Sequence, residues 1–244
     1  MCYNIQVLER RADKMAKRYN ALFPQGDLFL QVYHASAFQH PLWPILTNRQ
    51  PHKLEFYQWG LIPYWCKNIE DAEKISNMTA NCMGETAFQK PSFRQAIGKN
   101  RCLVPVTGFF EWHTIGKKKY PFYIYKNDNE IFSLAGIYDN WVNKESGEIF
   151  NTFSILTTTA NSLLARIHNS KKRMPVILPL ETENDWIDPS LSKEQVIELL
   201  KPFDENLLSA HAISKRITSR TENNNVPEVM DAYEYPELKE EFNS

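Results

Sequence analysis

The chain has 244 residues, of which 43% are hydrophobic and 23% charged, the balance of an ordinary globular protein that folds without disulfides or structural metal. No stretch approaches the roughly 18 uninterrupted apolar residues of a membrane helix, and the first residues lack the plan of a signal peptide, so we expect a cytoplasmic protein with no membrane partner. The net charge of −1 argues against binding nucleic acid through bulk electrostatics.

In the first half of the chain, residues 7–22 carry apolar side chains at helical spacing and predict an amphipathic helix. Residues 27–33 and 54–59 predict strands, separated by a loop with two prolines. Residues 91–98 predict a short helix with Pro91 in its first turn.

The middle of the chain is dense in β-branched and aromatic residues, which is typical of strands. We expect four β segments there, at residues 102–112, 121–126, 131–138 and 150–159. The polar run Asn127–Glu130 predicts a hairpin turn between the second and the third.

Further on, residues 161–167 predict a helix leading into His168, and residues 174–178 predict a strand. Ser192 is a suitable N-cap for a helix that ends near Leu200. These elements predict an α+β fold: a single domain with a largely antiparallel, barrel-like β core and peripheral helices.

The charge is distributed unevenly, since residues 228–241 hold six acidic residues and one lysine, a net of −5 that leaves +4 on the rest. We therefore expect a folded domain over residues 1–225, ending in a polar loop, and a mobile acidic tail over residues 226–244. A focused basic groove on the domain is compatible with this balance. Each basic group taken alone indicates a solvated surface: Lys117–Lys119, Lys171–Arg173, Arg94 with Lys99 and Arg101, and Arg216 with Arg220.

Four cysteines are present, and none lies at the spacing of a zinc site. We expect Cys66, Cys82 and Cys102 to be free buried thiols, and we expect no metal and no cofactor. Cys2 differs, because removal of Met1 makes it the first residue. It then carries an amine of pKa ~7.7 beside a thiol of pKa ~8.5, and an aldehyde can close a five-membered thiazolidine on that pair.

Further motifs follow Cys2 in order: Trp59-Gly60-Leu61-Ile62-Pro63, Asn81-Cys82-Met83-Gly84-Glu85-Thr86, Gly108-Phe109-Phe110-Glu111-Trp112, and Ile167-His168 with Arg173-Met174-Pro175. In order and spacing they resemble the SRAP family (SOS-response-associated peptidase) from residue 2 to about residue 220. The resemblance implies a protein that removes its own Met1 and crosslinks the exposed cysteine to abasic sites in single-stranded DNA. It also implies an SOS or DNA-damage role, and we expect a monomer that meets replication-fork proteins and associates with the nucleoid when bound to DNA.

The resemblance implies that the catalytic residues are Cys2, Asn81, Glu111 and His168. Glu111 lies between Phe110 and Trp112, where desolvation raises a carboxyl pKa toward neutrality and suits it to shuttle protons. His168 titrates near neutral pH in the ordinary case and is expected to protonate the sugar oxygen. Asn81 donates hydrogen bonds without becoming charged.

Single strands are held by a basic groove and by flat side chains on which bases stack. The resemblance makes Pro63, Tyr64 and Trp65 a wedge that flanks the lesion. Phosphate contacts are expected from Arg94, Lys171, Arg173 and Lys215, and Met83 takes the DNA-facing position that is an arginine in the family.

The chain departs from the family pattern near its start, where Tyr3 and Asn4 replace the usual glycine and arginine. The segment Tyr33–Ser36 replaces an Asn-x-Ala-Pro turn, and Asn169–Arg173 lengthens the loop after His168. These departures affect DNA binding more than the covalent step.

Two alternatives remain open at the level of sequence. An N-terminal-nucleophile amidohydrolase also exposes a cysteine at residue two, but it needs an oxyanion hole for an amide and makes no use of the Glu111 strand. A non-catalytic shield for single-stranded DNA would bind abasic DNA tightly without a covalent bond. Turnover of glutamine separates the first from the family function, and a denaturing gel separates the second.

Overall fold

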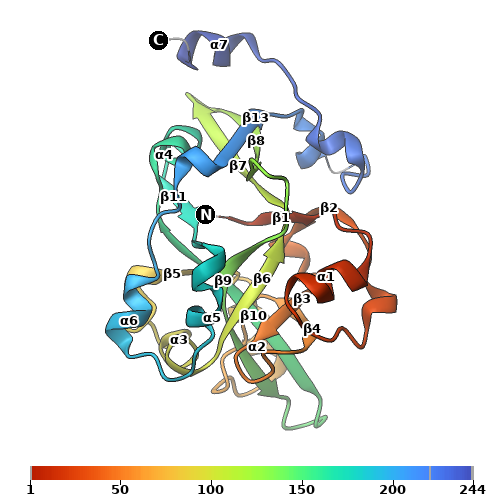
Figure 1. The fold of residues 1–244 in the computed structure, drawn as a ribbon, viewed down its shortest axis with the longest axis vertical. Helices are drawn as coiled ribbons and strands as arrows, with labels where there is room; N and C mark the ends of the chain where they lie inside the picture. Colours follow the sequence, from red (N-terminus) through yellow and green to blue (C-terminus); the bar gives the residue numbers. More distant parts are fainter. Residues whose placement is uncertain (1, 220, 243–244) are drawn as a thin grey trace.

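The computed structural model describes residues 2–219 and 221–242 and confirms the α+β fold (Figure 1). The strands are β1 (Asn4–Val7), β2 (Val32–Ser36), β3 (Leu42–Thr47), β4 (Leu54–Trp59), β5 (Asn81–Met83), β6 (Arg101–Val106), β7 (Gly108–Ile115), β8 (Lys118–Lys126), β9 (Phe132–Val142), β10 (Ile149–Thr159), β11 (Arg173–Pro175), β12 (Ile177–Leu178) and β13 (Leu208–Ala212). The helices are α1 (Ala12–Arg18), α2 (Ile69–Ser76), α3 (Arg94–Lys99), α4 (Ser162–Ile167), α5 (Glu183–Trp186), α6 (Lys193–Glu198) and α7 (Pro236–Phe242).

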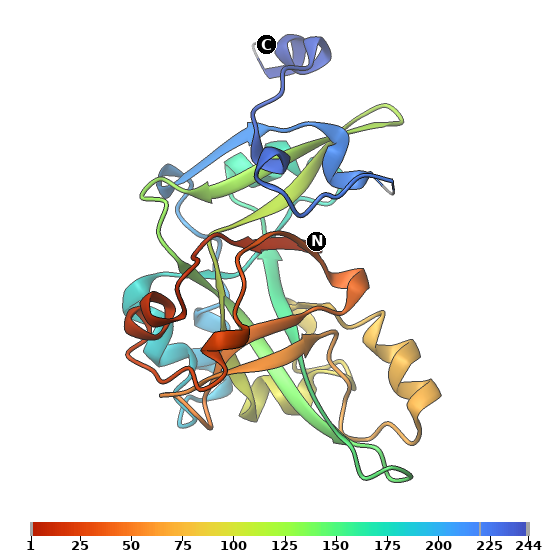
Figure 2. The same cartoon turned by 90° about the vertical axis from the view of Figure 1, so that its right-hand side faces the viewer.

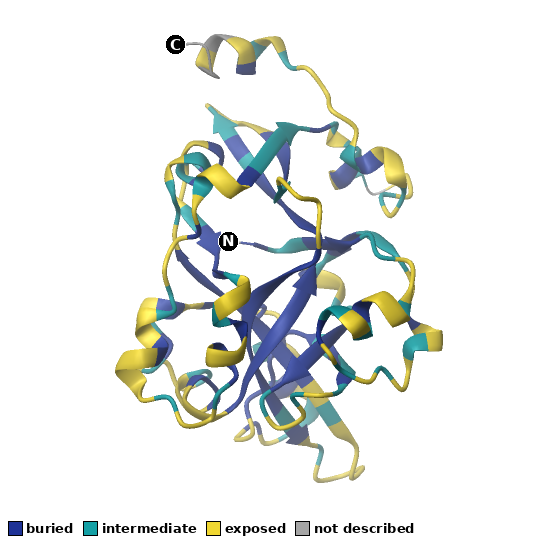
Figure 3. Cartoon of the chain, in the orientation of Figure 1, coloured by how far each residue is buried: buried dark blue, intermediate teal, exposed yellow. Residues whose placement is uncertain are grey.

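Five strands close into a barrel in the order β10–β4–β3–β6–β9, because β9 also pairs with β10. All of these pairings are antiparallel except that of β10 with β4, so the expectation of a largely antiparallel, barrel-like core is confirmed. Most residues of β6 and β9 are buried on both faces, which Figure 3 shows as a dark centre surrounded by exposed helices. β10 also holds β5 and β11, and this strand therefore carries two of the candidate site's elements.

A second antiparallel sheet, in the order β13–β8–β7–β1–β2, lies beside the barrel. Figure 2 shows β7, β8 and β13 above the barrel, with β1 and the start of the chain between the two. β1 thus lies between β7 and β2 in this second sheet. In the described part of the chain, no helix is long and apolar enough to cross a membrane.

The N-terminal segment differs from its prediction. Residues 4–7 form a strand, and the helix predicted over residues 7–22 is shortened to α1. Ile5 pairs with Ala35 on one side and Phe109 on the other, and these distant partners, invisible in a local pattern, make a strand the better solution. The strand predicted over residues 27–33 likewise begins only at Val32.

The hairpin predicted at Asn127–Glu130 is absent among the described pairings, because β8 pairs with β7 and β13 while β9 pairs with β6, β10 and β12. The segment instead crosses from one sheet to the other. β9 is buried along nearly all its length, because its apolar side chains lose more contact with water inside the barrel than they would at the edge of the second sheet. The β segment predicted over residues 102–112 is also divided, into β6 and β7.

Other expectations match closely. The strand predicted over residues 54–59 is β4, and Ser192 caps α6 with a reciprocal capping box to Gln195. The four cysteines are free and buried. Arg101, by contrast, is fully buried instead of forming part of a surface basic group, and its guanidinium donates to the carbonyls of Trp186 and Ile97.

The acidic segment after residue 225 was predicted to be mobile, and its described part packs on the second sheet. The Tyr233 amide donates to the Ala212 carbonyl at 2.8 Å, and the Tyr235 hydroxyl donates to the Ile213 carbonyl at 2.9 Å. α7 stands beyond β8 at the end of the molecule (Figures 1 and 2). The domain boundary at residue 225 stays a prediction.

Candidate active site

The start of the chain reaches the centre of the site through β1. Ile5 pairs with Phe109 and Gln6 with Gly108 in an antiparallel register. Tyr3, just before β1, lines the same pocket as Glu111. Cys2, next to Tyr3, is fully buried, and its thiol lies 3.8 Å from the Asn4 carbonyl.

Two more candidate residues come from elements that flank β10. Asn81 begins β5 and pairs in parallel with Ile155 of β10. His168 is the C-cap of α4, just before the loop to β11, and its amide donates to the Leu164 carbonyl at 2.7 Å. β5 and β11 pair with the two edges of β10 at Thr157, so this strand holds both of the distant segments.

Glu111 is the electrostatic centre of this cluster. Its side chain comes from β7 and is almost completely buried. Burial disfavours the charged form and raises the pKa of the carboxyl to about 7, which confirms the expectation from its apolar neighbours. The group therefore holds or releases a proton readily at neutral pH.

The charges of the predicted catalytic residues are coupled through Glu111. Burial, and then the nearby Glu111 carboxylate, raise the pKa of the Cys2 thiol well above its ordinary value. The carboxylate also lies 3.6 Å from the Nδ1 of His168. Burial raises the pKa of Tyr3, whereas the neighbouring Asn81 amide lowers it. Cys2, Asn81, Glu111 and His168 therefore form one cluster, with Tyr3 as an additional member that the sequence marked only as a departure from the family pattern.

Asn81 has unused hydrogen-bonding capacity. Its side chain is 8% exposed, and neither amide atom makes a conventional hydrogen bond to another described residue, although the Tyr3 hydroxyl is close enough to interact with its dipole. A buried amide without such a bond costs free energy on the order of 1–3 kcal/mol. A ligand that supplies a donor and an acceptor here would recover that energy.

His168 differs from its prediction. Burial lowers its pKa to about 4, so the ring is neutral at pH 7 and is not the proton donor expected from an ordinary histidine. Its Nδ1 lies 3.0 Å from the Arg173 carbonyl, which only accepts hydrogen bonds. The proton of the neutral ring therefore sits on Nδ1, and Nε2 is the acceptor nitrogen.

This protonation state is directly measurable. We expect nitrogen-detected NMR of labelled protein to show His168 as the neutral Nδ1–H tautomer from pH 8 down to pH 5, with its midpoint near pH 4. A His168 midpoint near the ordinary value of about 6.5 would contradict this account.

A pocket of about 330 Å³ opens beside the cluster. Tyr3, Glu111 and His168 contribute to its walls, while the buried Cys2 and Asn81 are not among the lining residues. The rest of the lining comes from Trp112, Thr114, Lys119, Ser170, Lys171 and Thr218. Of the predicted phosphate contacts, only Lys171 lines the pocket, and Lys119 joins it from a run that appeared to be an ordinary solvated face.

Two other predicted phosphate contacts are already engaged by the protein. Arg173 donates two hydrogen bonds to Glu85, at 2.6 and 2.9 Å, and a third to the Thr157 carbonyl. The Lys215 ammonium lies over the rings of Tyr120 and Tyr235. Arg173 would have to break these hydrogen bonds to contact DNA as predicted, whereas Lys215 remains exposed.

The predicted wedge follows β4. Pro63 is buried and supports the turn, whereas Tyr64 and Trp65 are 54% and 41% exposed. The Trp65 indole donates to the Pro91 carbonyl at 3.2 Å, which places it beside the turn that leads to α3 and the exposed Arg94.

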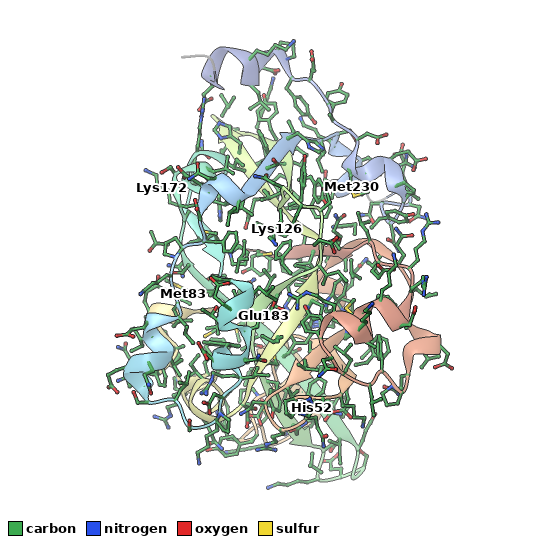
Figure 4. All side chains as sticks on the ribbon, viewed as in Figure 1. His52, Met83, Lys126, Lys172, Glu183 and Met230 are labelled. Carbon is green, nitrogen blue, oxygen red and sulfur yellow. The ribbon has the colours of Figure 1, made fainter. Side chains whose placement is uncertain are left out.

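Met83, exposed at the end of β5, lies along the same margin of the molecule as Lys172 (Figure 4). β5 and β11 both pair with β10, so the segments that carry Met83 and the Lys171–Arg173 loop flank one strand.

Comparison with known proteins agrees with this geometry. The model of the SOS response associated peptidase (SRAP) family matches residues 1–220. The chain is 33% identical over 228 residues to the abasic site processing protein YoqW of Bacillus subtilis (strain 168), an alignment that covers 91% of this chain and 95% of YoqW. It is 30% identical over 183 residues to the abasic site processing protein HMCES of Gallus gallus, covering 66% of this chain and 53% of HMCES.

A crystal structure of a protein from Bacteroides thetaiotaomicron superposes with a TM-score of 0.89 at 42% identity, covering 95% of this chain and 100% of that one. A second, from Bordetella bronchiseptica, has a TM-score of 0.74 at 24% identity over 87% of this chain and 100% of that one, a likeness of fold. The family match spans nearly the whole described domain and every residue of the cluster. The chain belongs to the SRAP family.

Proposed function

We propose that this protein processes abasic sites by capturing the ring-opened aldehyde of the lesion in single-stranded DNA as a covalent thiazolidine on Cys2, after it has removed its own Met1. The observation that carries the proposal is the cluster itself, in which Cys2 lies beside a buried carboxyl whose pKa is about 7. Two relatives that bear the name abasic site processing protein support the same substrate class.

The covalent step balances without an oxidant or a cofactor. The amine of Cys2 attacks the aldehyde carbon, and loss of water from the resulting carbinolamine gives an imine. The thiol sulfur then adds to the imine carbon, and the thiol proton moves to the nitrogen of the new ring. The whole sequence releases one water.

Glu111 is proposed to carry the protons in this sequence. As a carboxylate it accepts a proton from the attacking amine, and as a carboxylic acid it returns that proton to the departing hydroxyl. A pKa of about 7 suits both directions. The same group is proposed to activate water for hydrolysis of the bond that joins Met1 to Cys2.

The raised pKa of the Cys2 thiol sets the order of the two attacks. A buried neutral thiol is a poor nucleophile, so the amine reacts first and the thiol closes the ring afterwards. The neutral His168 is proposed to accept a hydrogen bond from the opened sugar through Nε2, and Asn81 to bind a sugar oxygen with its amide.

The aldehyde itself is the feature to test. A single-stranded oligonucleotide with one abasic site should give a covalent band on a denaturing gel, and the same DNA treated beforehand with methoxyamine should not. Methoxyamine caps the aldehyde and leaves the missing base unchanged. A covalent band that persists after capping would contradict the proposal, as would turnover of glutamine in place of crosslinking.

The pocket lysines are expected to hold phosphates that flank the sugar. We predict that Lys119→Gln and Lys171→Gln each weaken binding to single-stranded DNA carrying a tetrahydrofuran abasic analogue. Each should also lower the slope of log affinity against log salt by about 0.7, the value for one phosphate contact to a single strand.

Lys117→Gln is the matched control for these variants, because Lys117 is exposed on the same strand connection but does not line the pocket. Fluorescence anisotropy at several salt concentrations measures both quantities. Equal slopes for all three variants would show that the pocket lysines make no direct phosphate contact.

A further inference from the structure

An exposed aromatic ring lies next to the candidate site and is not explained by the chemistry above. Phe38 is 65% exposed in the 3₁₀ turn Ala37–Gln39. Its ring stacks on that of Tyr3, with the centroids 5.0 Å apart and the planes inclined by 27°. Because Tyr3 also lines the pocket of Glu111 and His168, its ring joins the pocket to the surface that Phe38 presents.

The turn that carries Phe38 is fixed in place by its neighbours. The Ala37 amide donates to the Tyr3 carbonyl at 2.8 Å, which ties the turn directly to the residue that follows Cys2. His40 ends the turn in the left-handed region, with φ of 47°, and its ring bonds the Trp59 carbonyl at 2.7 Å and Asn77 at 3.0 Å.

Gly60 makes this anchoring possible. A Cβ at that position would lie 2.6 Å from the His40 ring, and its φ of 117° is one that side-chain-bearing residues rarely adopt. The Trp59-Gly60 motif therefore supports the turn that holds Phe38. A large aromatic ring that is both exposed and rigidly held is suited to binding, because little conformational entropy is lost when a partner stacks on it.

We propose that Tyr3 and Phe38 form a stacking platform for the nucleobase next to the abasic site. The inference rests on the proposed function and adds a residue-level contact to it. Loss of a base leaves its neighbour in the strand without a stacking partner on one side. A flat aromatic surface continuous with the pocket that receives the sugar can replace that partner, and such stacking tolerates any base.

The chemistry of the platform matches a base better than a peptide. The exposed face of Phe38 is a single ring, and the surface next to it leads into a pocket rimmed by Lys119 and Lys171, the charges that a nucleotide's phosphates require. In this chain the platform depends on Tyr3, which stands where the family pattern has a glycine. A glycine there would leave Phe38 without its stacking partner.

The test uses single-stranded DNA in which a tetrahydrofuran replaces the abasic sugar, so that no aldehyde is present and binding is non-covalent. We expect Phe38→Ala to weaken binding by about 5- to 150-fold, the range for loss of one base–aromatic stack, and Phe38→Trp to retain affinity. Leu42→Ala is the matched control, because Leu42 is also 65% exposed but lies on β3 and away from the pocket lining. It should bind as the wild type does.

A second oligonucleotide removes the flanking bases on both sides of the lesion. The wild type should lose affinity for it, and Phe38→Ala should bind it as well as the wild type does. A 2-aminopurine placed beside the lesion should report stacking through quenched fluorescence in the wild type, with the quenching lost in Phe38→Ala. Unchanged DNA affinity in Phe38→Ala, or an equal loss of affinity for both oligonucleotides, would contradict base stacking on Phe38. The exposed ring would then be better explained as a contact for a protein partner.

The covalent assay on aldehyde-bearing DNA is run beside these measurements. If the wild type crosslinks but the platform tests fail, the proposed function stands without this contact. If the wild type does not crosslink, the non-covalent measurements still decide whether Tyr3 and Phe38 bind a base.

Discussion

Glu111→Gln is expected to slow crosslinking to abasic DNA by about 10²- to 10⁴-fold, the usual contribution of a general acid–base group. The amide keeps the shape of the side chain but neither accepts the proton of the attacking amine nor returns it to the leaving hydroxyl. Single-turnover rates from quenched time courses on denaturing gels measure the loss, with DNA in saturating excess. A rate within about threefold of the wild type would remove Glu111 from the proton path.

The same variant is expected to be more stable than the wild type at alkaline pH. The pKa of Glu111 is about 7 in the folded protein and near 4.5 in the unfolded chain, so the unfolded chain ionises first. The wild type therefore loses stability between about pH 4.5 and pH 7 and stays at the lower level above that range. The difference corresponds to about 3 kcal/mol, which Glu111→Gln should recover at pH 8 but not at pH 4.

Urea unfolding at pH 8 and pH 4 tests whether Glu111→Gln is stabilised relative to the wild type only at the higher pH. Glu183→Gln is the matched control, because Glu183 is also buried but pairs with Arg18 at 2.7 and 3.0 Å. Removing its charge should lower stability at pH 8, opposite to the effect at Glu111. If both variants changed the free energy of unfolding in the same direction at pH 8, the conclusion that the ionised Glu111 carboxylate destabilises the folded protein would be wrong.

Cys2→Ser is expected to abolish the stable crosslink to abasic DNA. The imine that precedes the crosslink should still form. A serine at this position keeps the amine, so an imine still forms, but the hydroxyl does not trap it as a thiazolidine. The covalent band should therefore be absent under ordinary conditions and should appear when borohydride reduces the imine. Processing of Met1 must be verified by mass for each variant before the comparison is made.

Cys66→Ser is the control for a buried thiol away from the cluster, and it should crosslink as the wild type does. A stable band from Cys2→Ser without reduction would mean that the sulfur is not part of the adduct. A missing band even with borohydride, in a variant that has lost Met1, would mean that the amine is not the nucleophile.

The sequence predicted those elements whose signals are local. The β4 strand and the Ser192 cap follow from residues within one element, and the raised pKa of Glu111 follows from its two apolar neighbours in the strand. The cluster was predicted through motifs whose order along the chain matched a family. The motifs come together because β1 pairs with β7 in one sheet while β5 pairs with β10 in the other, and this arrangement has no counterpart in any single segment.

What the sequence did not reveal depends on distant partners. Tyr3 enters the site because β1 pairs with β7, and Lys119 because it precedes the buried part of β8 opposite Thr114. His168 departs from its ordinary pKa because surrounding segments exclude water from it, which its sequence neighbours do not indicate. Arg173 is hydrogen-bonded to Glu85, a residue far from it in the chain.

The most direct test of the central claim is the intact mass of the purified protein–DNA adduct, measured before and after borohydride treatment. The account predicts the mass of the protein without Met1 plus the oligonucleotide minus one water, unchanged by borohydride because a thiazolidine has no imine to reduce. A gain of two hydrogens on reduction, an adduct that retains Met1, or no adduct from protein that has lost Met1 would contradict it.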